Sequence, residues 1–579
     1  MNVSHHVESA QKLVEMLPRR AIVLSRRLLS HRQAYNCPRR HNSSHNEPHT
    51  TYFQQPPVQQ VVRPKLRWRI LRGTLIAVTS AALAVSYTTG KIITDLDQLR
   101  DVAEEVKRGL EGYGGKPVSL EERTAYERAT ETVFYDAEKA NNVLSYGSGW
   151  SASTSAISQT CRLPANVPCE DQHVSLGFYS PHDPTRQWWI WGIFDGHAGP
   201  RTSAFLADVL PTMVGSRLIE AGALTAEHAL TSEEINELIA DAFVQTDEDI
   251  LGQAQELLSS ADKSRAFALN VASLADQGSC ALVAVYDPYN KVLRVANTGD
   301  SRAVLGRWDA GQSRYVAMPM SVDQTGFNED EVKRLEAEHP GEDIIDKSSG
   351  RLFGLAVTRA FGDSRWKFPE NITSFLHQAL WTSPPRPKGV VKTPPYLTAR
   401  PEVKDVKIQL GAKPDFLILA SDGLWDQLST EQAVELVQMW LDKYNPKDVA
   451  LTAQKLLQGP DRLATCTGDV LTPGSSPTLT SHEASNDKSD ADLYYDPEEK
   501  SLRWKNKREY FTVENESCSN HLVRNALGGN RDGLFAALMS LPPTRTRDVR
   551  DDITTTVVFF GADTSGIDAE RLGDAPRQD

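Results

Sequence analysis

Four strongly apolar runs in this chain each border an aspartate, and this arrangement constrains the fold more than any other feature. The runs are rich in Val, Ile, Leu and aromatic residues, which is the composition of buried β-strands. They are Trp188–Phe194, followed by Asp195; Val292–Thr298, followed by Gly299 and Asp300; Phe416–Ala420, followed by Ser421 and Asp422; and Ile553–Phe560, preceded by Asp551 and Asp552. The sequence therefore predicts buried strands that deliver carboxylates at their tips.

Clustered carboxylates repel one another and are tolerated mainly when a cation neutralises them. The predicted donor set holds only oxygen atoms apart from one histidine, and hard ions such as Mg²⁺ or Mn²⁺ prefer such a set. Gly196 and Gly423 follow two of the aspartates and allow a close approach of the backbone. Each Asp-Gly pair taken alone is also typical of a turn, so the interpretation depends on the combination.

Composition excludes several classes of protein. The chain has 579 residues, of which 40% are apolar and 24% charged, as in ordinary globular proteins. Its six cysteines, at positions 37, 161, 169, 280, 466 and 518, form no CxxC pair. Neither a disulfide framework nor a zinc site is therefore predicted, and Cys280, within a strand-like run, is expected to be a small core residue.

Charge divides the chain into two parts. Residues 1–72 have a net charge of +10, whereas residues 73–579 have a net charge of −23. An acidic body argues against nucleic acid as a partner, because phosphate backbones bind basic surfaces.

The first 90 residues are expected to be a targeting segment rather than part of the fold. Residues 1–72 are Arg-rich and acid-poor, which is typical of a mitochondrial presequence; a disordered basic arm is the alternative. Residues 73–90 carry no charge and just reach the length of a membrane span. They form an inner-membrane anchor, a buried helix or part of a sorting signal. The predicted location is mitochondrial, and the matrix, the inner membrane and the intermembrane space all stay open.

The remaining chain is expected to contain a helical linker over residues 91–140, one catalytic domain over 141–563 and a tail over 564–579. Helices are predicted over Asn328–Glu338, where Asn328 and Glu331 have capping-box spacing, and over Glu431–Tyr444, which Ser429 and Gln432 would cap. Residues 462–500 are rich in Ser, Thr, Asp and Pro and are expected to be a disordered insertion.

Seven ordered motifs resemble those of the metal-dependent, type 2C serine/threonine protein phosphatases. They are Glu170-Asp171, FDGHAG (194–199), DQGSCALVAV (276–285), NTGDSRAVLG (297–306), LAVTRAFGD (355–363), SDGLWD (421–426) and DDIT (551–554).

Within that family the chain is similar to the mitochondrial pyruvate dehydrogenase phosphatases. The shared stretches are TPPYLTARPEV (393–403), HLVRNALG (521–528) and RDDIT (550–554). The subgroup also has Asn, here Asn166, where most members have a phosphate-binding Arg. Asn166 is therefore the predicted phosphate contact, and which group replaces the missing Arg stays open. Arg400 stands where an acidic residue is expected in the animal enzymes, and the 462–500 insertion lies outside the shared pattern.

The resemblance implies an α+β fold in which a central antiparallel β-sandwich is flanked by helices on both faces. It also implies a two-metal site at one edge of the sandwich. Asp195 would bridge the two Mg²⁺ or Mn²⁺ ions, and the other ligands would be the Gly196 carbonyl, Asp422, Asp551, Glu170 and Asp171, with Asp300 at a weaker third site. His197 would be the general acid, or alternatively a structural residue that orients Asp195.

The implied activity is the hydrolysis of phosphoserine and phosphothreonine in proteins, with the pyruvate dehydrogenase α subunit as the expected substrate. Two alternatives come from other classes. A pseudophosphatase would bind phosphoproteins without hydrolysing them, but the chain retains the expected metal carboxylates. A two-metal nuclease would use a similar acidic cluster, and the acidic body argues against it. Arg302 and Arg359 are expected to tie loops together rather than to contact substrate.

Overall fold

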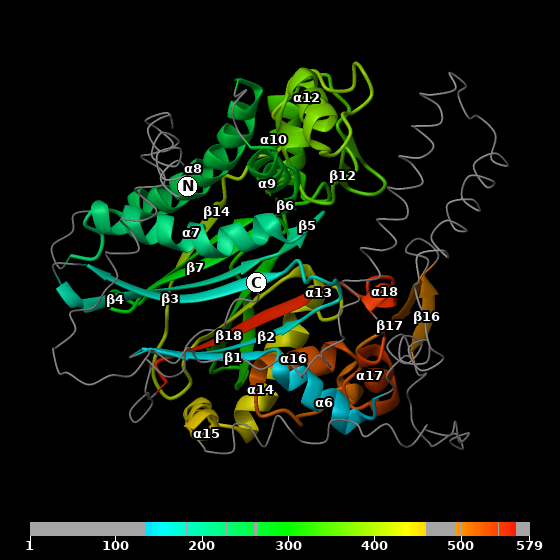
Figure 1. Cartoon of the computed structure of the whole chain (residues 1–579). Coiled ribbons are helices and arrows are strands. Elements are labelled where there is room, and N and C mark those ends of the chain that lie inside the picture. The colour runs from blue at the N-terminus through cyan, green and yellow to red at the C-terminus, as the bar shows by residue number, and fades with distance from the viewer. Residues whose placement is uncertain are drawn as a thin grey trace, which may run out of the picture. The chain divides into compact units, whose positions relative to one another are not determined.

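Two antiparallel sheets organise the part of the chain that the computed structural model describes (Figure 1). The described residues are 135–562 without 154, 181–182, 226–229, 260–263, 459–491, 497–500 and 542. The predictions for residues 1–72, 73–90 and 564–579, and for most of the 91–140 linker, therefore lie outside the described residues. Among the residues that are described, no helix combines the length and the apolar character that a membrane span requires.

Six strands form the first sheet and five form the second, and neighbouring strands run antiparallel in both. In spatial order the first sheet contains β1 (Ser148–Ala152), β2 (Ala156–Leu163), β18 (Ile553–Phe560), β15 (Phe416–Ala420), β9 (Arg302–Asp309) and β10 (Arg314–Pro319). The second contains β14 (Glu402–Lys407), β8 (Val292–Thr298), β7 (Ala281–Asp287), β4 (Asp183–Phe194) and β3 (Gln172–Ser180).

The central strands are apolar at nearly every position because both of their faces are buried. Side chains alternate between the two faces of a strand. In β7, Ala281, Val283 and Val285 face the outer helices, whereas Leu282 and Ala284 face the other sheet. In β15, Leu417 and Leu419 meet them from the opposite side, while the alternate residues of β15 face the helices below. The inner layer of the sandwich is therefore a core shared by both sheets.

Helices cover both outer faces (Figure 1). The second sheet is covered by α7 (Arg201–Glu220), α8 (Ser232–Glu256) and α9 (Arg265–Asp276), and the one-turn η1 (Leu257–Ser259) follows α8. The first sheet is covered by α6 (Ala137–Tyr146), α14 (Thr430–Lys443), α15 (Pro446–Gln458), α16 (Cys518–Ala526) and α17 (Asp532–Met539). Leu206, Leu210, Val214 and Leu218 of α7 recur every four residues and are fully buried, as expected of a helix that packs on a sheet. The predicted α+β sandwich with helices on both faces is thus confirmed.

Several shorter elements lie at the ends of the strands. They are β5 (Gly196–His197), β6 (Gly278–Ser279) and β13 (Phe361–Gly362), which form a small three-stranded sheet, together with α11 (Ser364–Lys367), α13 (Asp422–Trp425), η3 (Arg508–Tyr510) and α18 (Pro543–Thr546). A segment between β10 and β14 contains α10 (Glu329–Glu338), the β11 (Ile345–Asp346) and β12 (Arg351–Leu352) hairpin, and α12 (Glu370–Leu380).

The elements that local sequence patterns predicted mostly have boundaries close to those of the structure. The strands Phe416–Ala420 and Ile553–Phe560 agree residue for residue with β15 and β18. At the start of α14, the Ser429 side chain accepts from the Gln432 N–H and the Gln432 side chain accepts from the Ser429 N–H, so the predicted capping box is confirmed.

The prediction for α10 is half right. Asn328 caps the helix by accepting from the Asp330 N–H at 3.0 Å, but Glu331 does not complete a capping box. Its carboxylate is 2% exposed and turns inward, where Arg359 and Arg334 pair with it. Two guanidinium groups are stronger partners for a carboxylate than one backbone N–H. Arg359 therefore ties its own loop to α10, as expected. Arg302 of β9 likewise pairs with Asp323, which lies after β10.

The described end of the 462–500 segment differs from the prediction of a disordered insertion. Residues 493–496 form β16 (Leu493–Asp496), which pairs with β17 (Ser501–Trp504) in a hairpin. The two tyrosines, Tyr494 and Tyr495, have high strand propensity, which accounts for the pairing of this segment.

Candidate functional site

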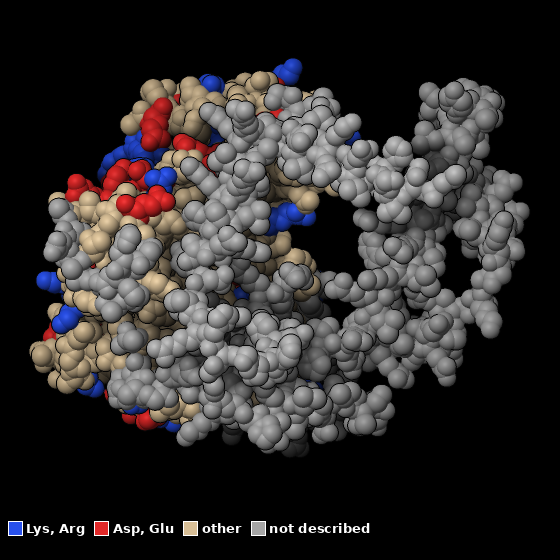
Figure 2. Space-filling view, turned by 60° about the vertical axis from the view of Figure 1, so that its left-hand side comes forward, with Lys and Arg blue, Asp and Glu red and all other residues tan. Residues whose placement is uncertain are grey.

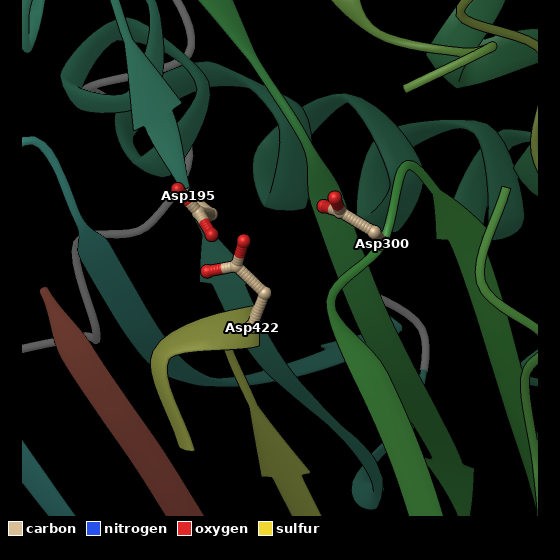
Figure 3. Close-up of side chains that lie close together, drawn as sticks. All are labelled: Asp195, Asp300 and Asp422. Atoms are coloured by element: carbon tan, nitrogen blue, oxygen red, sulfur yellow. The ribbon is translucent and has the colours of Figure 1, made fainter. Parts of the chain in front are cut away.

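Three aspartates from both sheets converge at one end of the sandwich (Figure 3). Asp195 lies between β4 and β5, Asp300 lies in the turn after β8, and Asp422 is the first residue of α13, directly after β15. One carboxylate oxygen of each lies within 4.8 Å of the others. In Figure 3 the carboxylates of Asp195 and Asp422 point toward one another, and Asp300 faces them from a separate loop. The structure thus brings three predicted ligands together.

Two glycines make this convergence possible. Gly299 adopts φ +110°, and a Cβ there would lie 2.3 Å from the Cys280 Sγ. Gly196 packs so closely that a Cβ would lie 2.5 Å from the Glu170 carbonyl oxygen. Side chains at either position would push the adjoining aspartate away from the cluster.

The three carboxylates lie in an environment that disfavours their charged forms. Burial, together with the charges of the neighbouring aspartates, raises the pKa of Asp195 well above its ordinary value. The pKa of Asp422 rises to about 7 through burial and the charge of Asp300. Burial also raises the pKa of Asp300. A cation would remove this repulsion.

The donor set fits a hard divalent cation. Oδ1 of Asp422 is buried and accepts no hydrogen bond, and the same holds for Oδ1 of Asp171 nearby. Buried carboxylate oxygens without donors are costly unless a cation binds them. The cluster contains only carboxylate oxygens, which is the ligand type of Mg²⁺ and Mn²⁺.

A cavity of about 470 Å³ opens onto the three aspartates. It is lined by five aspartates, four arginines and a histidine among other residues: Asp195, Asp300, Asp422, Asp426, Asp551, Arg351, Arg503, Arg547, Arg550, His197, Gly196, Cys280, Leu355, Ala356 and Val357. A larger cavity of about 760 Å³ lies over the β11–β12 hairpin and shares Arg351, but the carboxylate cluster is not part of it. The smaller cavity is therefore the candidate active site.

His197 is held by an aspartate at the cavity wall. Its Nε2 lies 2.7 Å from Oδ2 of Asp363, which is 1% exposed, whereas the imidazole is 29% exposed. Burial favours the neutral imidazole, but the charge and hydrogen bond of Asp363 outweigh it and raise the pKa of His197. Asp363 adopts φ +48° at the single position between β13 and α11. The pair can hold a proton beside the cavity.

Glu170, Asp171 and Asn166 are not among the residues that line the cavity. Asp171 is buried and its Oδ2 accepts from the Ser421 hydroxyl at 2.8 Å. The Asn166 side-chain amide donates to Glu170 Oε2 at 2.9 Å and to Asp552 Oδ2 at 3.3 Å. The Asn166 amide is therefore engaged by two carboxylates.

Asp551 lies on the cavity wall but outside the tight group of three. Its carboxylate pairs with Arg547 and accepts from the Asp552 N–H at 2.7 Å. The side chain is 23% exposed, so it borders both the cluster and the solvent.

Four residues in or next to the candidate site escaped sequence reasoning. Asp363 lies in the quoted LAVTRAFGD motif and Asp552 in DDIT, but nothing local marked the former as the partner of His197. Asp552 accepts from the N–H groups of Ala165, Asn166 and Glu170, so it fixes the loop that carries Glu170. Arg503 and Arg547 reach the cavity from distant segments.

Cys280 is buried as predicted, and its Sγ lies 3.3 Å from Oδ1 of Asp300.

The described part of the face in Figure 2 has mixed charge. In Figure 2 the Lys and Arg side chains on the described part of this face lie beside Asp and Glu side chains rather than in one continuous basic area. The exclusion of nucleic acid stays a prediction.

Comparisons with known proteins agree with this geometry. The family model described as "Protein phosphatase 2C" matches residues 159–459. A protein phosphatase 2C homolog of Schizosaccharomyces pombe is 35% identical over 402 residues, covering 69% of this chain and 79% of that protein. The mitochondrial pyruvate dehydrogenase (acetyl-transferring) phosphatase 1 of Saccharomyces cerevisiae is 33% identical over 415 residues, covering 69% and 68%. The protein of that name from Homo sapiens is 30% identical over 508 residues, covering 76% and 82%.

Proposed function

This chain belongs to the protein phosphatase 2C family, and from that membership we propose that it hydrolyses phosphoserine and phosphothreonine in proteins with Mg²⁺ or Mn²⁺. The observation that carries the proposal is the group formed by Asp195, Asp300 and Asp422 in a cavity that also contains His197. Phosphate monoesters hydrolyse extremely slowly unaided, so such a site must supply on the order of 20 kcal/mol or more of barrier reduction.

The proposed metal ligands are those that the family resemblance implies. Asp195 and the Gly196 carbonyl would hold the first ion, with Glu170 and Asp171 acting through its waters. Asp422 and Asp551 would hold the second ion, and Asp300 a weaker third. Bound divalent ions would supply a water of lowered pKa and would neutralise the phosphoryl oxygens.

His197 is the proposed general acid. Asp363 engages Nε2 and favours the imidazolium form, which leaves the Nδ1–H to protonate the serine or threonine oxygen that departs from phosphorus. Its exposure at the cavity wall supports this role.

The proposed substrate is the phosphorylated α subunit of the mitochondrial pyruvate dehydrogenase complex. Relatives named as mitochondrial pyruvate dehydrogenase phosphatases support this proposal, as do the shared stretches at 393–403 and 521–528 and the basic residues 1–72. A mitochondrial phosphatase with other phosphoprotein substrates is the alternative. Association with the inner membrane is proposed only on residues 73–90.

Release of phosphate from a phosphoserine peptide tests the activity. We expect release with Mn²⁺ and none with EDTA; binding without release would indicate a pseudophosphatase, and cleavage of DNA or RNA would indicate a nuclease.

The substrate is tested separately by deleting the gene. The α subunit should then be hyperphosphorylated in isolated mitochondria, and unchanged phosphorylation would reject this substrate while leaving the activity intact.

A further inference from the structure

The candidate active-site cavity is lined by arginines as well as by aspartates, and the metal ligands do not account for the arginines. Arg351, Arg503, Arg547 and Arg550 all contribute to its wall. We propose that Arg547 and Arg503 bind the phosphoryl group of the substrate. This inference rests on the proposed phosphatase function and identifies the groups that recognise the phosphate dianion.

A positive group is needed because the residue first predicted for this contact cannot supply one. Asn166 is neutral, lies outside the cavity wall, and donates its amide hydrogens to Glu170 and Asp552. Five aspartates line the cavity, so cationic donors on its wall would favour binding of a phosphoryl group in addition to any bound metal ions.

Two of the four arginines are less suited to this role. Arg550 is buried, and its guanidinium donates to the Pro164 carbonyl at 2.8 Å and to the Asp551 carbonyl at 3.0 Å, so it holds two loops together. Arg351 is exposed on β12, donates to the Gly354 carbonyl at 3.2 Å, and also lines the larger cavity.

Arg547 has the position and the donors that the role requires. Its side chain is 51% exposed at the cavity wall, and its Nη1 pairs with Asp551. A guanidinium has five N–H donors, so one edge can remain with Asp551 while another binds phosphoryl oxygens. Because Asp551 is a proposed metal ligand, this pair would place the guanidinium next to the reacting phosphate.

Arg503 reaches the same wall from a different element. It lies on β17, where it is opposite Tyr494 of β16, and its Nη1 donates to the Val549 carbonyl at 3.2 Å. Val549 is two residues from both Arg547 and Asp551, so this bond attaches the hairpin to the segment that carries the other arginine. The hairpin thus brings a second guanidinium to the wall at which Arg547 lies.

The test measures phosphate binding directly as well as hydrolysis. Equilibrium dialysis with radiolabelled inorganic phosphate in Mg²⁺ would be applied to the full chain and to Arg547→Gln, Arg503→Gln, Arg547→Lys and Arg545→Gln. Arg545 is the matched control, since it lies two residues from Arg547, is 73% exposed and pairs with Asp548 outside the cavity. Thermal unfolding and Mn²⁺ binding of each variant report on folding and on the metal site.

Loss of a charged contact should weaken phosphate binding by about ten- to a hundredfold in Arg547→Gln and Arg503→Gln. Arg547→Lys should lose less, and Arg545→Gln should match the wild type. The kcat/KM for a phosphoserine peptide should fall in parallel, while Mn²⁺ affinity is retained. The inference is overturned if neither Gln variant changes phosphate affinity, if lost Mn²⁺ binding explains the change, or if the wild type binds no phosphate. If the wild type binds phosphate through these arginines but hydrolyses nothing, the proposed function fails and this inference stands.

Discussion

At the scale of single residues, the three aspartates at the end of the sandwich lower the stability of the fold around them. Asp195, Asp300 and Asp422 are crowded without a counter-charge among them, and burial raises the pKa of each. Buried and crowded carboxylates of this kind destabilise the fold and are typical of a functional site. Substitutions at these positions should therefore separate activity from stability.

Asp195→Asn and Asp551→Asn should each abolish hydrolysis while leaving the fold intact, because the change falls on ion binding. Phosphate release from a phosphoserine peptide at saturating Mn²⁺ is the measurement, with Asp548→Asn as an exposed control near Asp551. Retention of more than a few per cent of the wild-type rate in either variant would refute the ligand assignment.

As pH rises, the stability of the metal-free protein should fall, whereas the stabilisation by added Mn²⁺ should grow. The pKa of Asp422 is about 7 in the folded chain against an ordinary value of 3.8, so the metal-free folded state binds more protons than the unfolded state between these values. Stability without metal should consequently fall as pH rises from about 5 to 7. Mn²⁺ competes with these protons, so the increase in Tm on adding Mn²⁺ should grow over the same range. Thermal unfolding in EDTA and in Mn²⁺ checks this, and an increment that shrinks with rising pH would contradict it.

At the scale of elements, α10 is joined to its surroundings by one buried carboxylate in addition to the apolar packing of Leu335. Glu331 accepts from Arg359, Arg334 and the Thr358 hydroxyl, and Arg359 also donates to the Arg400 carbonyl at 2.9 Å. Burial would raise the pKa of Glu331, but the hydrogen bonds and charges of the two arginines outweigh it and lower the pKa to about 2. The carboxylate therefore holds the helix to the segment that precedes β14.

Glu331→Gln should destabilise the protein by about 3–5 kcal/mol, since it removes the buried anion that Arg359 and Arg334 share and leaves them only the more exposed Glu402 and Glu338. Glu338→Gln is the matched control because Glu338 is 49% exposed on the same helix and pairs with Arg334; its cost should be about 0–1 kcal/mol. Denaturant unfolding measures both.

The contribution of Glu331 is present above pH 4.5 and is lost as pH falls toward 2, so the variant should lose less stability in acid than the wild type. Equal costs for the two variants would show that the buried pair does not hold α10.

At the scale of the whole molecule, the active site depends on how the two sheets face each other. Asp195 and Asp300 follow strands of one sheet, and Asp422 follows a strand of the other. Side chains such as Trp191, Leu282, Leu419 and Val558 fill the layer between the sheets and set their separation. The candidate active-site cavity is therefore a property of the sandwich as a unit rather than of any one element.

Residues 1–90 are predicted to direct the whole protein to mitochondria. A fusion of these residues to a soluble reporter should be imported, because the segment is Arg-rich and acid-poor before the uncharged stretch at 73–90. Microscopy of the fusion, with a variant in which Arg19, Arg20, Arg26 and Arg27 are replaced by Gln as the control, measures this. A diffuse cytosolic signal from the unaltered fusion would reject the prediction, and carbonate extraction of the imported protein tests the anchor.

The sequence by itself determined the most apolar central strands, the capped helix α14, the family and the aspartates at the strand tips. Each of these depends on local chemistry: a run of β-branched and aromatic residues specifies a buried strand, and Ser429 with Gln432 specifies a helix start. Such patterns act over a few residues and need no knowledge of what packs against them.

Only the tertiary structure decided which distant groups meet. His197 pairs with Asp363 across 166 positions, Asn166 turns to Asp552 across 386, and Glu331 leaves its helix cap for Arg359 across 28. Arg503 and Arg547 reach the cavity because the β16–β17 hairpin and the segment before β18 come together there. A charged side chain selects its partner by proximity and burial in the folded chain, and neither quantity is encoded in the spacing of neighbouring residues.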